Sequence, residues 1–155
     1  MTEATRHELV LTRLIDASPE ALYRCWTEPA LVKQWFAPQP LTTPVAEIDV
    51  RAGGTCHIVM HDPGSKTDYP CDGIYLEVVP NRRIVSTDAY TRAWEPSAKP
   101  FMTLIVTFEP EGTGTRYTAV ARHWNAEDKA THENMGFHEG WGRCTDQLTA
   151  LARSL

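Results

Sequence analysis

Near the C-terminus, two histidines have the residue types of a zinc-binding helix but the wrong spacing for one. His132 and Glu133 begin a run that would match H-E-x-x-H if its fifth residue were histidine, but that residue is Gly136. The next histidine, His138, lies about 120° away from His132 around a helix. Two ligands of one zinc ion must share a helix face. We therefore predict no metal site here, and no motif in the sequence predicts a cofactor.

Three further histidines fall on predicted strands. His57 and His61 would share one face of a strand but stand about 13 Å apart, which is too far for a common metal ion. His123 ends a strand just before the C-terminal helix, so it would lie where strand and helix meet. It is the better candidate for a functional group. It could equally be a buried structural histidine, and the sequence leaves both interpretations open.

The common motifs of nucleophilic and phosphate chemistry are absent from the sequence. It contains no G-x-S-x-G elbow, no P-loop, and no G-x-G-x-x-G after a strand. An enzymatic activity would therefore need an acid or a base inside a cavity. The cysteines are scattered, without a C-x-x-C pair, at Cys25, Cys56, Cys71 and Cys144. We interpret them as reduced, mostly buried thiols of a cytoplasmic protein.

Composition narrows the class of protein. The chain has 155 residues, of which 42% are hydrophobic and 23% charged, as is usual for a globular domain. A net charge of −5 without a basic block argues against nucleic acid as a partner. No apolar stretch approaches the roughly 20 residues of a membrane span. The first residues lack the apolar segment of a signal peptide, so we expect none.

Changes in hydrophobic period divide the chain into an α+β pattern. Residues 8–16 alternate as a first strand, and two short helices follow, begun by Ser18-Pro19 and by Pro29. Asn125 caps a final helix that we expect to run unbroken to about Arg153. Between them we predict strands at 45–50, 55–61, 72–79, 83–90, 102–108 and 116–123. The pattern predicts one domain, residues 1–155 with a core at about 8–153, in which the long helix covers a curved antiparallel sheet.

The final helix combines features of a core helix and of a ligand site. Gly136 and Gly140 should let it approach the sheet closely. Helical projection places Glu133 and Asn134 on its buried side and His132 well away from that side. A buried carboxylate needs a partner, so Glu133 could pair with an arginine at the edge or anchor a ligand. The predicted core stripe consists of Phe137, Trp141, Cys144, Leu148, Leu151 and Leu155.

Six segments in this order resemble one superfamily. They are IDASPEALYRCWTEP at 15–29, WFAP at 35–38, DVRAGG at 49–54, GIYLEVVP at 73–80, GTR at 114–116 and GFHEGWG at 136–142. The chain is similar to the SRPBCC superfamily, which has the START/Bet v 1-like helix-grip fold. Within it, the chain resembles the group related to the C-terminal domain of the activator of Hsp90 ATPase. The resemblance covers roughly residues 8–153.

This resemblance implies a fold and a choice of functions. The implied fold is a seven-stranded antiparallel sheet wrapped around a long C-terminal helix, with two short helices closing one end. The cavity between sheet and helix commonly takes apolar or amphipathic small molecules. Members include lipid and polyketide binders, cyclases and the Hsp90-binding domain. The chain could be a monomer or a homodimer.

Our leading hypothesis is a binding domain for a small apolar or amphipathic ligand. Trp94, on a proline-flanked loop, could gate the cavity, while His123, Glu133 and Asn134 would orient the ligand. The alternatives are a polyketide cyclase or hydrolase that uses His123 or Glu133 as its base, and an Hsp90-binding module. The expected apolar wall consists of Trp35, Phe36, Met60, Tyr75, Leu104, Val106, Ala119, Phe137 and Trp141.

Overall fold

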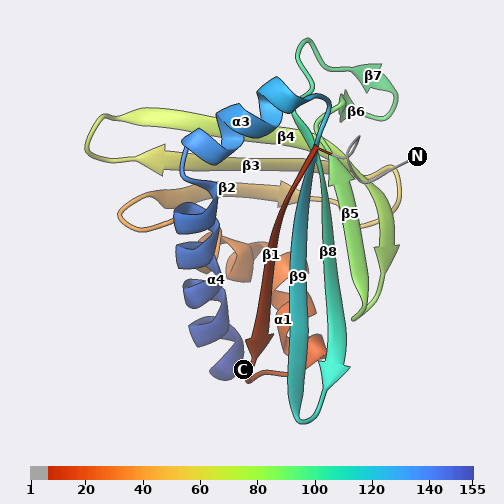
Figure 1. Ribbon diagram of the computed structural model, residues 1–155, viewed down its shortest axis with the longest axis vertical. Helices are drawn as coiled ribbons and strands as arrows, with labels where there is room; N and C mark the ends of the chain where they lie inside the picture. Colours follow the sequence, from red (N-terminus) through yellow and green to blue (C-terminus); the bar gives the residue numbers. More distant parts are fainter. Residues whose placement is uncertain (1–6) are drawn as a thin grey trace.

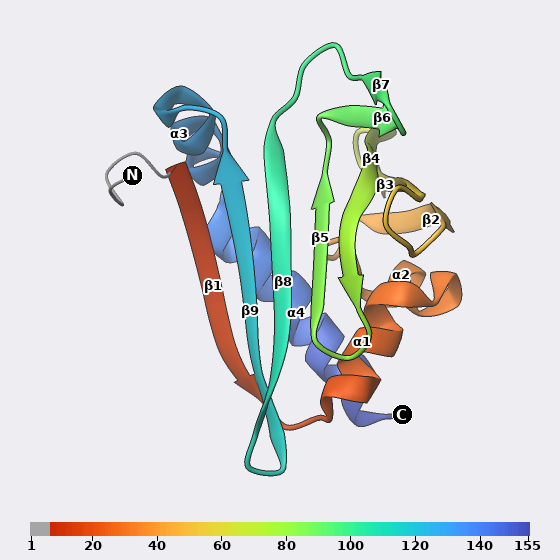
Figure 2. The same ribbon diagram turned by 90° about the vertical axis from the view of Figure 1, so that its right-hand side faces the viewer.

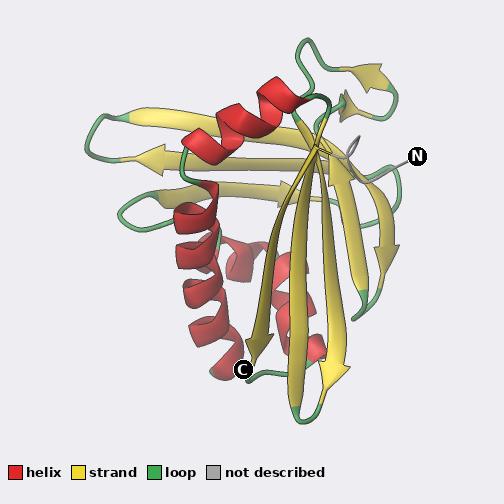
Figure 3. Ribbon diagram, viewed as in Figure 1, coloured by secondary structure: helices red, strands yellow, loops and turns green. Residues whose placement is uncertain are grey.

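A strongly curved antiparallel sheet and the helices inside its curve make up residues 7–155, the part of the chain that this computed structural model describes (Figures 1 and 3). Residues 1–6, where we expected no signal peptide, lie outside the described part. The predicted α+β helix-grip architecture is confirmed.

The sheet has seven strands in the order β1-β9-β8-β5-β4-β3-β2. Strand β1 therefore lies beside β9, near the other end of the chain, and every neighbouring pair is antiparallel. The strands are β1 (His7–Ile15), β2 (Thr42–Ile48), β3 (Thr55–Asp62), β4 (Thr67–Val79), β5 (Arg83–Thr87), β8 (Met102–Glu111) and β9 (Gly114–His123). Strands β6 (Tyr90–Arg92) and β7 (Glu95–Pro96) form a small separate hairpin where we expected only a loop.

The longest strand, β4, carries the curvature of the sheet. Its register with β5 shifts between Tyr75 and Glu77, and a bulge of this kind bends a strand and increases its twist. In Figure 1, β2, β3 and the first half of β4 run across the strands β1, β9 and β8. The sheet thus encloses a space on its concave side.

Two short helices close one end of that space, as predicted. Helix α1 (Pro19–Thr27) begins with Ser18, whose hydroxyl accepts a 3.1 Å hydrogen bond from the Ala21 amide. Helix α2 (Pro29–Trp35) begins at a proline, whose fixed φ suits the first helical position. The indole Nε1 of Trp35 donates a 2.8 Å hydrogen bond to the Cys25 carbonyl and joins the two helices.

The prediction of one unbroken C-terminal helix was wrong. The structure has α3 (Ala126–Asn134) and α4 (Phe137–Arg153), separated by Met135 and Gly136. Gly136 has φ +88°, a left-handed conformation that interrupts a right-handed helix and that L-residues with a side chain rarely adopt. Seen from the sheet side in Figure 2, α4 crosses behind β1, β9 and β8, and α3 lies at the end of β1 and β9.

We predicted that Gly136 and Gly140 would let the helix approach the sheet closely, and this prediction was wrong. A Cβ on Gly136 or on Gly140 would meet nothing within 4 Å, so neither residue permits a close approach to the sheet. A Cβ on Gly142 would lie 3.2 Å from Nη2 at the flexible end of the Arg13 side chain on β1, which would have to shift slightly. Only Gly136 is required for its backbone conformation in this segment.

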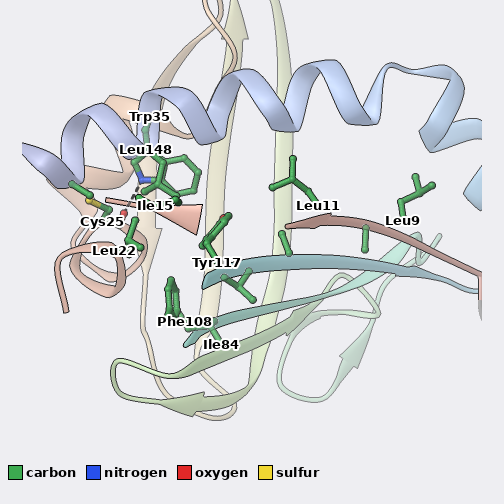
Figure 4. Packing of buried hydrophobic residues seen from close by; sticks show 14 of the residues in the cluster. Leu9, Leu11, Ile15, Leu22, Cys25, Trp35, Ile84, Phe108, Tyr117 and Leu148 are labelled. Carbon is green, nitrogen blue, oxygen red and sulfur yellow. Dashed lines mark hydrogen bonds between the residues drawn. The ribbon is translucent and has the colours of Figure 1, made fainter. Parts of the chain in front are cut away.

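The core lies between α4, α1 and the concave face of the sheet (Figure 4). Leu148 of α4 and Leu22 of α1 are completely buried, as are Val106, Phe108 and Ala119 on β8 and β9. Most of the predicted core stripe of α4 is buried or half-buried, but Leu155 is 47% exposed because α4 ends at Arg153. The nearest neighbours of α4 are α1, α2 and β1. Within residues 7–155, no helix combines the length and the apolar character needed to cross a membrane.

Candidate functional site

The predicted apolar wall divides into two groups by exposure. Its buried members pack within the protein core and leave almost no surface for a ligand: Trp35, Tyr75, Val106, Ala119 and Phe137. Its other members are half-buried and keep accessible surface: Phe36, Met60, Leu104 and Trp141. The second group could touch a bound molecule directly, whereas the first group could only support it.

Two aromatic rings of α4 stack beside that half-buried surface. The ring centroids of Phe137 and Trp141 are 4.7 Å apart with an interplanar angle of 30°. Phe137 is 2% exposed, so its ring is held between protein groups, while Trp141 is only half-buried. Phe137 therefore fixes the position of Trp141, whose own surface remains accessible.

Two buried histidines meet next to this stack. His123 at the end of β9 and His132 on α3 are 5% and 7% exposed. Nε2 of His123 lies 2.7 Å from Nδ1 of His132, and Nδ1 of His123 lies 2.9 Å from the carbonyl oxygen of His7 on β1. Three elements are thus joined through two imidazole rings.

These contacts fix the positions of the ring protons. A carbonyl oxygen only accepts, so Nδ1 of His123 carries a proton and donates it to His7. In a neutral His123, Nε2 is then an acceptor, and Nδ1 of His132 must donate to it. Burial, together with the adjacent His123, lowers the pKa of His132 to about 4, so this ring is neutral at physiological pH. Nε2 of His132 therefore carries a lone pair.

Phe101 covers the histidine pair from the other side. Its ring centroid is 5.4 Å from that of His123 and 5.2 Å from that of His132. Asp88 holds this segment in place, because its Oδ1 accepts hydrogen bonds from the amides of Phe101 at 2.8 Å and Met102 at 3.1 Å. Burial raises the pKa of Asp88. Phe101 and Asp88 were not among the predicted site residues.

The expected orientation of Glu133 and Asn134 was wrong, and so was that of His132. Glu133 and Asn134 are exposed, and the Glu133 carboxylate lies 4.0 Å from the His138 ring at the surface. The break at Gly136 explains the error. A projection carried from α4 back through Gly136 assumes continuous helical rotation, and the left-handed residue changes it. His132 points inward instead.

Trp94 lies away from the buried site residues. It is 69% exposed on the β6–β7 hairpin, where its ring packs edge-on against Tyr90 with centroids 5.6 Å apart. The hairpin contacts β4. A gating role for Trp94 stays a prediction.

The thiols and buried tyrosines are poorly placed for ionic chemistry. All four cysteines are free. Burial raises the pKa of Cys25 to about 11 and that of Cys144 to about 12, which keeps both protonated. Burial also raises the pKa of Tyr75 and of Tyr117 well above that of free tyrosine.

The histidines of β3 pair with acidic residues on neighbouring strands. His57 bonds to the carboxylate of Asp72, which raises the pKa of the histidine, and His61 lies 2.7 Å from Asp68. Among the described residues, no group of three or more His, Cys, Asp or Glu side chains is arranged to hold a metal ion. These pairs tie β3 to β4.

Two surface hollows share only Trp35 with the predicted wall. One, of about 590 Å³, is lined by Lys33, Gln34, Leu41 and Gln147 among others, and includes Trp35 from the predicted wall. The other, of about 550 Å³, lies beside Glu47 and His57 on β2 and β3. Their linings include charged and amide side chains, so they differ in chemistry from the aromatic surface near Trp141.

Taken together, the curved sheet, the enclosed C-terminal helix and the two closing helices define a helix-grip domain, a class of ligand-binding folds. The chain matches the family described as Activator of Hsp90 ATPase homolog 1-like protein over residues 16–153, and it belongs to that family. No functionally curated protein matches it.

Solved structures of similar proteins share the whole fold. Protein NE0264 from Nitrosomonas europaea is 35% identical, with a TM-score of 0.92 over 99% of this chain and 97% of that one. Protein CV1439 from Chromobacterium violaceum is 27% identical, with a TM-score of 0.76 over 94% and 96% of the two chains. Protein Ms6760 from Mycobacterium smegmatis is 23% identical, with a TM-score of 0.79 over 93% of this chain and 89% of that one. At this identity the likeness shows the common fold alone.

Proposed function

We propose that the protein binds an apolar or amphipathic small molecule between the concave face of the sheet and helix α4. The observation that supports this most is the set of half-buried apolar side chains that pack against the core there, namely Phe36, Leu104 and Trp141. Apolar surface left in contact with water is unfavourable, and a ligand that covers it gains about 25 cal/mol per Å².

The strand pattern supports the inward orientation of this surface. Leu104 is two residues from Val106 and four from Phe108, both completely buried, so it lies on the same face of β8. It pairs with Ala121 on β9, which is completely buried. Phe36 is brought near α4 by the thiol of Cys144, which lies 3.3 Å from the Phe36 carbonyl oxygen.

The alternative enzymatic function has less support from the two predicted bases. Both ring nitrogens of His123 are already engaged, with His7 and with His132. Glu133 is exposed, with its carboxylate near His138. Neither group would meet a molecule between the sheet and α4 with a free basic atom.

A continuous apolar patch on the outer face of the sheet would support the alternative of binding to Hsp90. The most exposed apolar side chains of β1 are Val10 and Leu14, and those of β4 are Leu76 and Val79. These two strands are separated by β9, β8 and β5, a distance of roughly 19 Å at the usual strand spacing. The exposed residues therefore support small-molecule binding ahead of this alternative. The free, high-pKa thiols suit a reducing compartment such as the cytoplasm.

A ligand screen tests the proposal. Aromatic alcohols, fatty acids and polyketide-like compounds would be tested by thermal shift and by native mass spectrometry. A ligand present at a hundred times its Kd should raise Tm by about 5 °C or more. The same ligand should shift a Trp141→Ala variant much less. If no compound stabilises the wild-type protein or appears as a complex, small-molecule binding at this site is wrong.

A further inference from the structure

Nε2 of His132 is a polar atom whose hydrogen-bonding capacity is unused within residues 7–155. The residue is 7% exposed, and its Nδ1 is engaged with His123. Nε2 has no hydrogen-bond partner among the described residues. A buried acceptor without a donor among these residues can be satisfied by a donor from a ligand.

The surroundings of this acceptor are aromatic. The ring centroid of His132 is 5.1 Å from that of Phe137, 5.9 Å from that of Trp141 and 5.2 Å from that of Phe101. Phe137 and Trp141 belong to α4 and Phe101 immediately precedes β8, so aromatic rings from two parts of the chain lie beside His132. Flat aromatic groups are favoured next to such rings because offset and edge-on contacts add to the area that they bury.

The hydrogen-bond chain behind His132 fixes which kind of polar group would fit. The carbonyl oxygen of His7 accepts a hydrogen bond from Nδ1–H of His123, and Nε2 of His123 in turn accepts one from Nδ1–H of His132. Nε2 can therefore accept but not donate while the ring is neutral. A hydroxyl group satisfies it, whereas a carboxylate would place its own lone pairs against that of Nε2.

We propose that His132 Nε2 accepts a hydrogen bond from the hydroxyl group of an aromatic alcohol that packs against Trp141. This assignment rests on the small-molecule binding proposed above and adds the ligand's chemical class. Because the pKa of His132 is lowered to about 4, the acceptor keeps its lone pair over the whole physiological pH range. His123 is a positioning residue here, since it orients the His132 ring without touching the ligand.

Matched probes and one matched variant test the assignment. The probes are 2-naphthol and 2-methoxynaphthalene, which share the ring system but differ in the hydroxyl proton. The variant is His132→Asn, whose side-chain amide can replace Nδ1–H as the donor to His123 but has no atom at the position of Nε2. Isothermal titration calorimetry on the full chain measures each Kd, and near-ultraviolet circular dichroism checks that the variant keeps its tertiary structure.

We expect wild-type protein to bind 2-naphthol about fivefold to tenfold more tightly than 2-methoxynaphthalene, as one hydrogen bond should give. His132→Asn should abolish this preference, so that the variant binds the two probes with equal affinity. Equal binding of the two probes by wild-type protein would overturn the role of His132 while leaving small-molecule binding intact. Binding of neither probe would overturn the assignment, and the wider ligand screen then decides whether small-molecule binding itself fails.

A measurement on wild-type protein keeps the test decisive if the variant does not fold. In protein labelled with ¹⁵N-histidine, two-bond proton–nitrogen correlations identify the tautomer of each ring. Both His123 and His132 should be Nδ1–H tautomers, and 2-naphthol should shift the Nε2 resonance of His132 more than 2-methoxynaphthalene does. An Nε2–H tautomer of His132, or identical shifts with the two probes, would contradict the proposal.

Discussion

Nδ1 of His132 lies 2.7 Å from Nε2 of His123, and this contact ties helix α3 to the end of strand β9. The carbonyl of His7 extends the connection to β1 at 2.9 Å. The contact also sets the position of His132 against Phe137 and Trp141, so the corner between sheet and helices is built around two buried imidazoles.

The histidine pair should make stability depend on pH between about 4 and 6.5. The pKa of His132 is about 4 in the folded protein and about 6.5 when unfolded. Over that interval the unfolded chain binds a proton that the folded protein does not. The stability that comes from keeping His132 neutral is therefore fully present above pH 6.5. It is lost as the pH falls from 6.5 through 4, by about 3 kcal/mol at most.

Chemical denaturation of wild-type protein and His132→Asn at several pH values measures this contribution. The comparison removes the contributions of other ionisable side chains, which include His123 in contact with the ring, His138 beside Phe137, and His57 with its raised pKa. The stability of wild type relative to the variant should fall as pH is lowered from 7 to 4. Parallel pH profiles would show that His132 is not buried in its neutral form.

The break between α3 and α4 predicts opposite effects of alanine at two glycines. Gly136→Ala should destabilise the protein by about 1–2 kcal/mol, because φ +88° is strained for any residue with a Cβ. Gly140→Ala should stabilise it by about 0.5–1 kcal/mol, because the position is inside α4 and a Cβ there meets nothing within 4 Å. Urea denaturation of both variants measures the difference. Equal effects would mean that the helix continues through Gly136.

This break also marks where prediction from the sequence ends. Alternation along β8 and β9, the caps Ser18 and Asn125, and the order of elements are local signals, and they predicted the sheet and the first two helices. The φ value of Gly136 is not visible in hydrophobic periodicity. The left-handed Gly136 rotates α3 relative to a continuation of α4. A projection from α4 therefore placed Glu133 inside, whereas His132 is the buried residue.

The histidine pair itself could not be found from spacing. His123 and His132 are on a strand and a helix, and they meet only because the chain turns sharply at Trp124 and Asn125. Phe101 reaches the pair from a third segment. One signal was present, because a glycine in the middle of a predicted helix is a candidate helix end. If the helix is taken to end at Gly136, the α4 pattern no longer predicts whether His132 faces the core or the solvent.

Trp141 should matter more for ligand binding than for folding. Trp141→Ala should weaken binding of 2-naphthol at least tenfold, because it removes an accessible aromatic surface. Leu151→Ala is the matched control, since Leu151 is also a half-buried apolar residue of α4 but lies nearly three helical turns further on. Calorimetry should show nearly unchanged binding by Leu151→Ala. A similar loss in both variants would indicate a general effect of destabilised α4.

The buried thiols should be protected from alkylation. With pKa values of about 11 and 12, Cys25 and Cys144 are almost entirely protonated at pH 8. Iodoacetamide should modify them at least about a hundredfold more slowly in folded protein than in urea, since only the thiolate reacts. Peptide mass mapping measures each rate. Rapid modification of Cys25 in folded protein would contradict its complete burial.

The location of the ligand is the central claim, and chemical-shift mapping tests it most directly. ¹H–¹⁵N spectra of the wild-type protein would be recorded during titration with 2-naphthol. The account predicts the largest shifts at the Trp141 indole N–H and at the amides of Leu104 and Phe137. Shifts confined to the polar hollow around Lys33 and Gln147, or no saturable shifts at all, would contradict it.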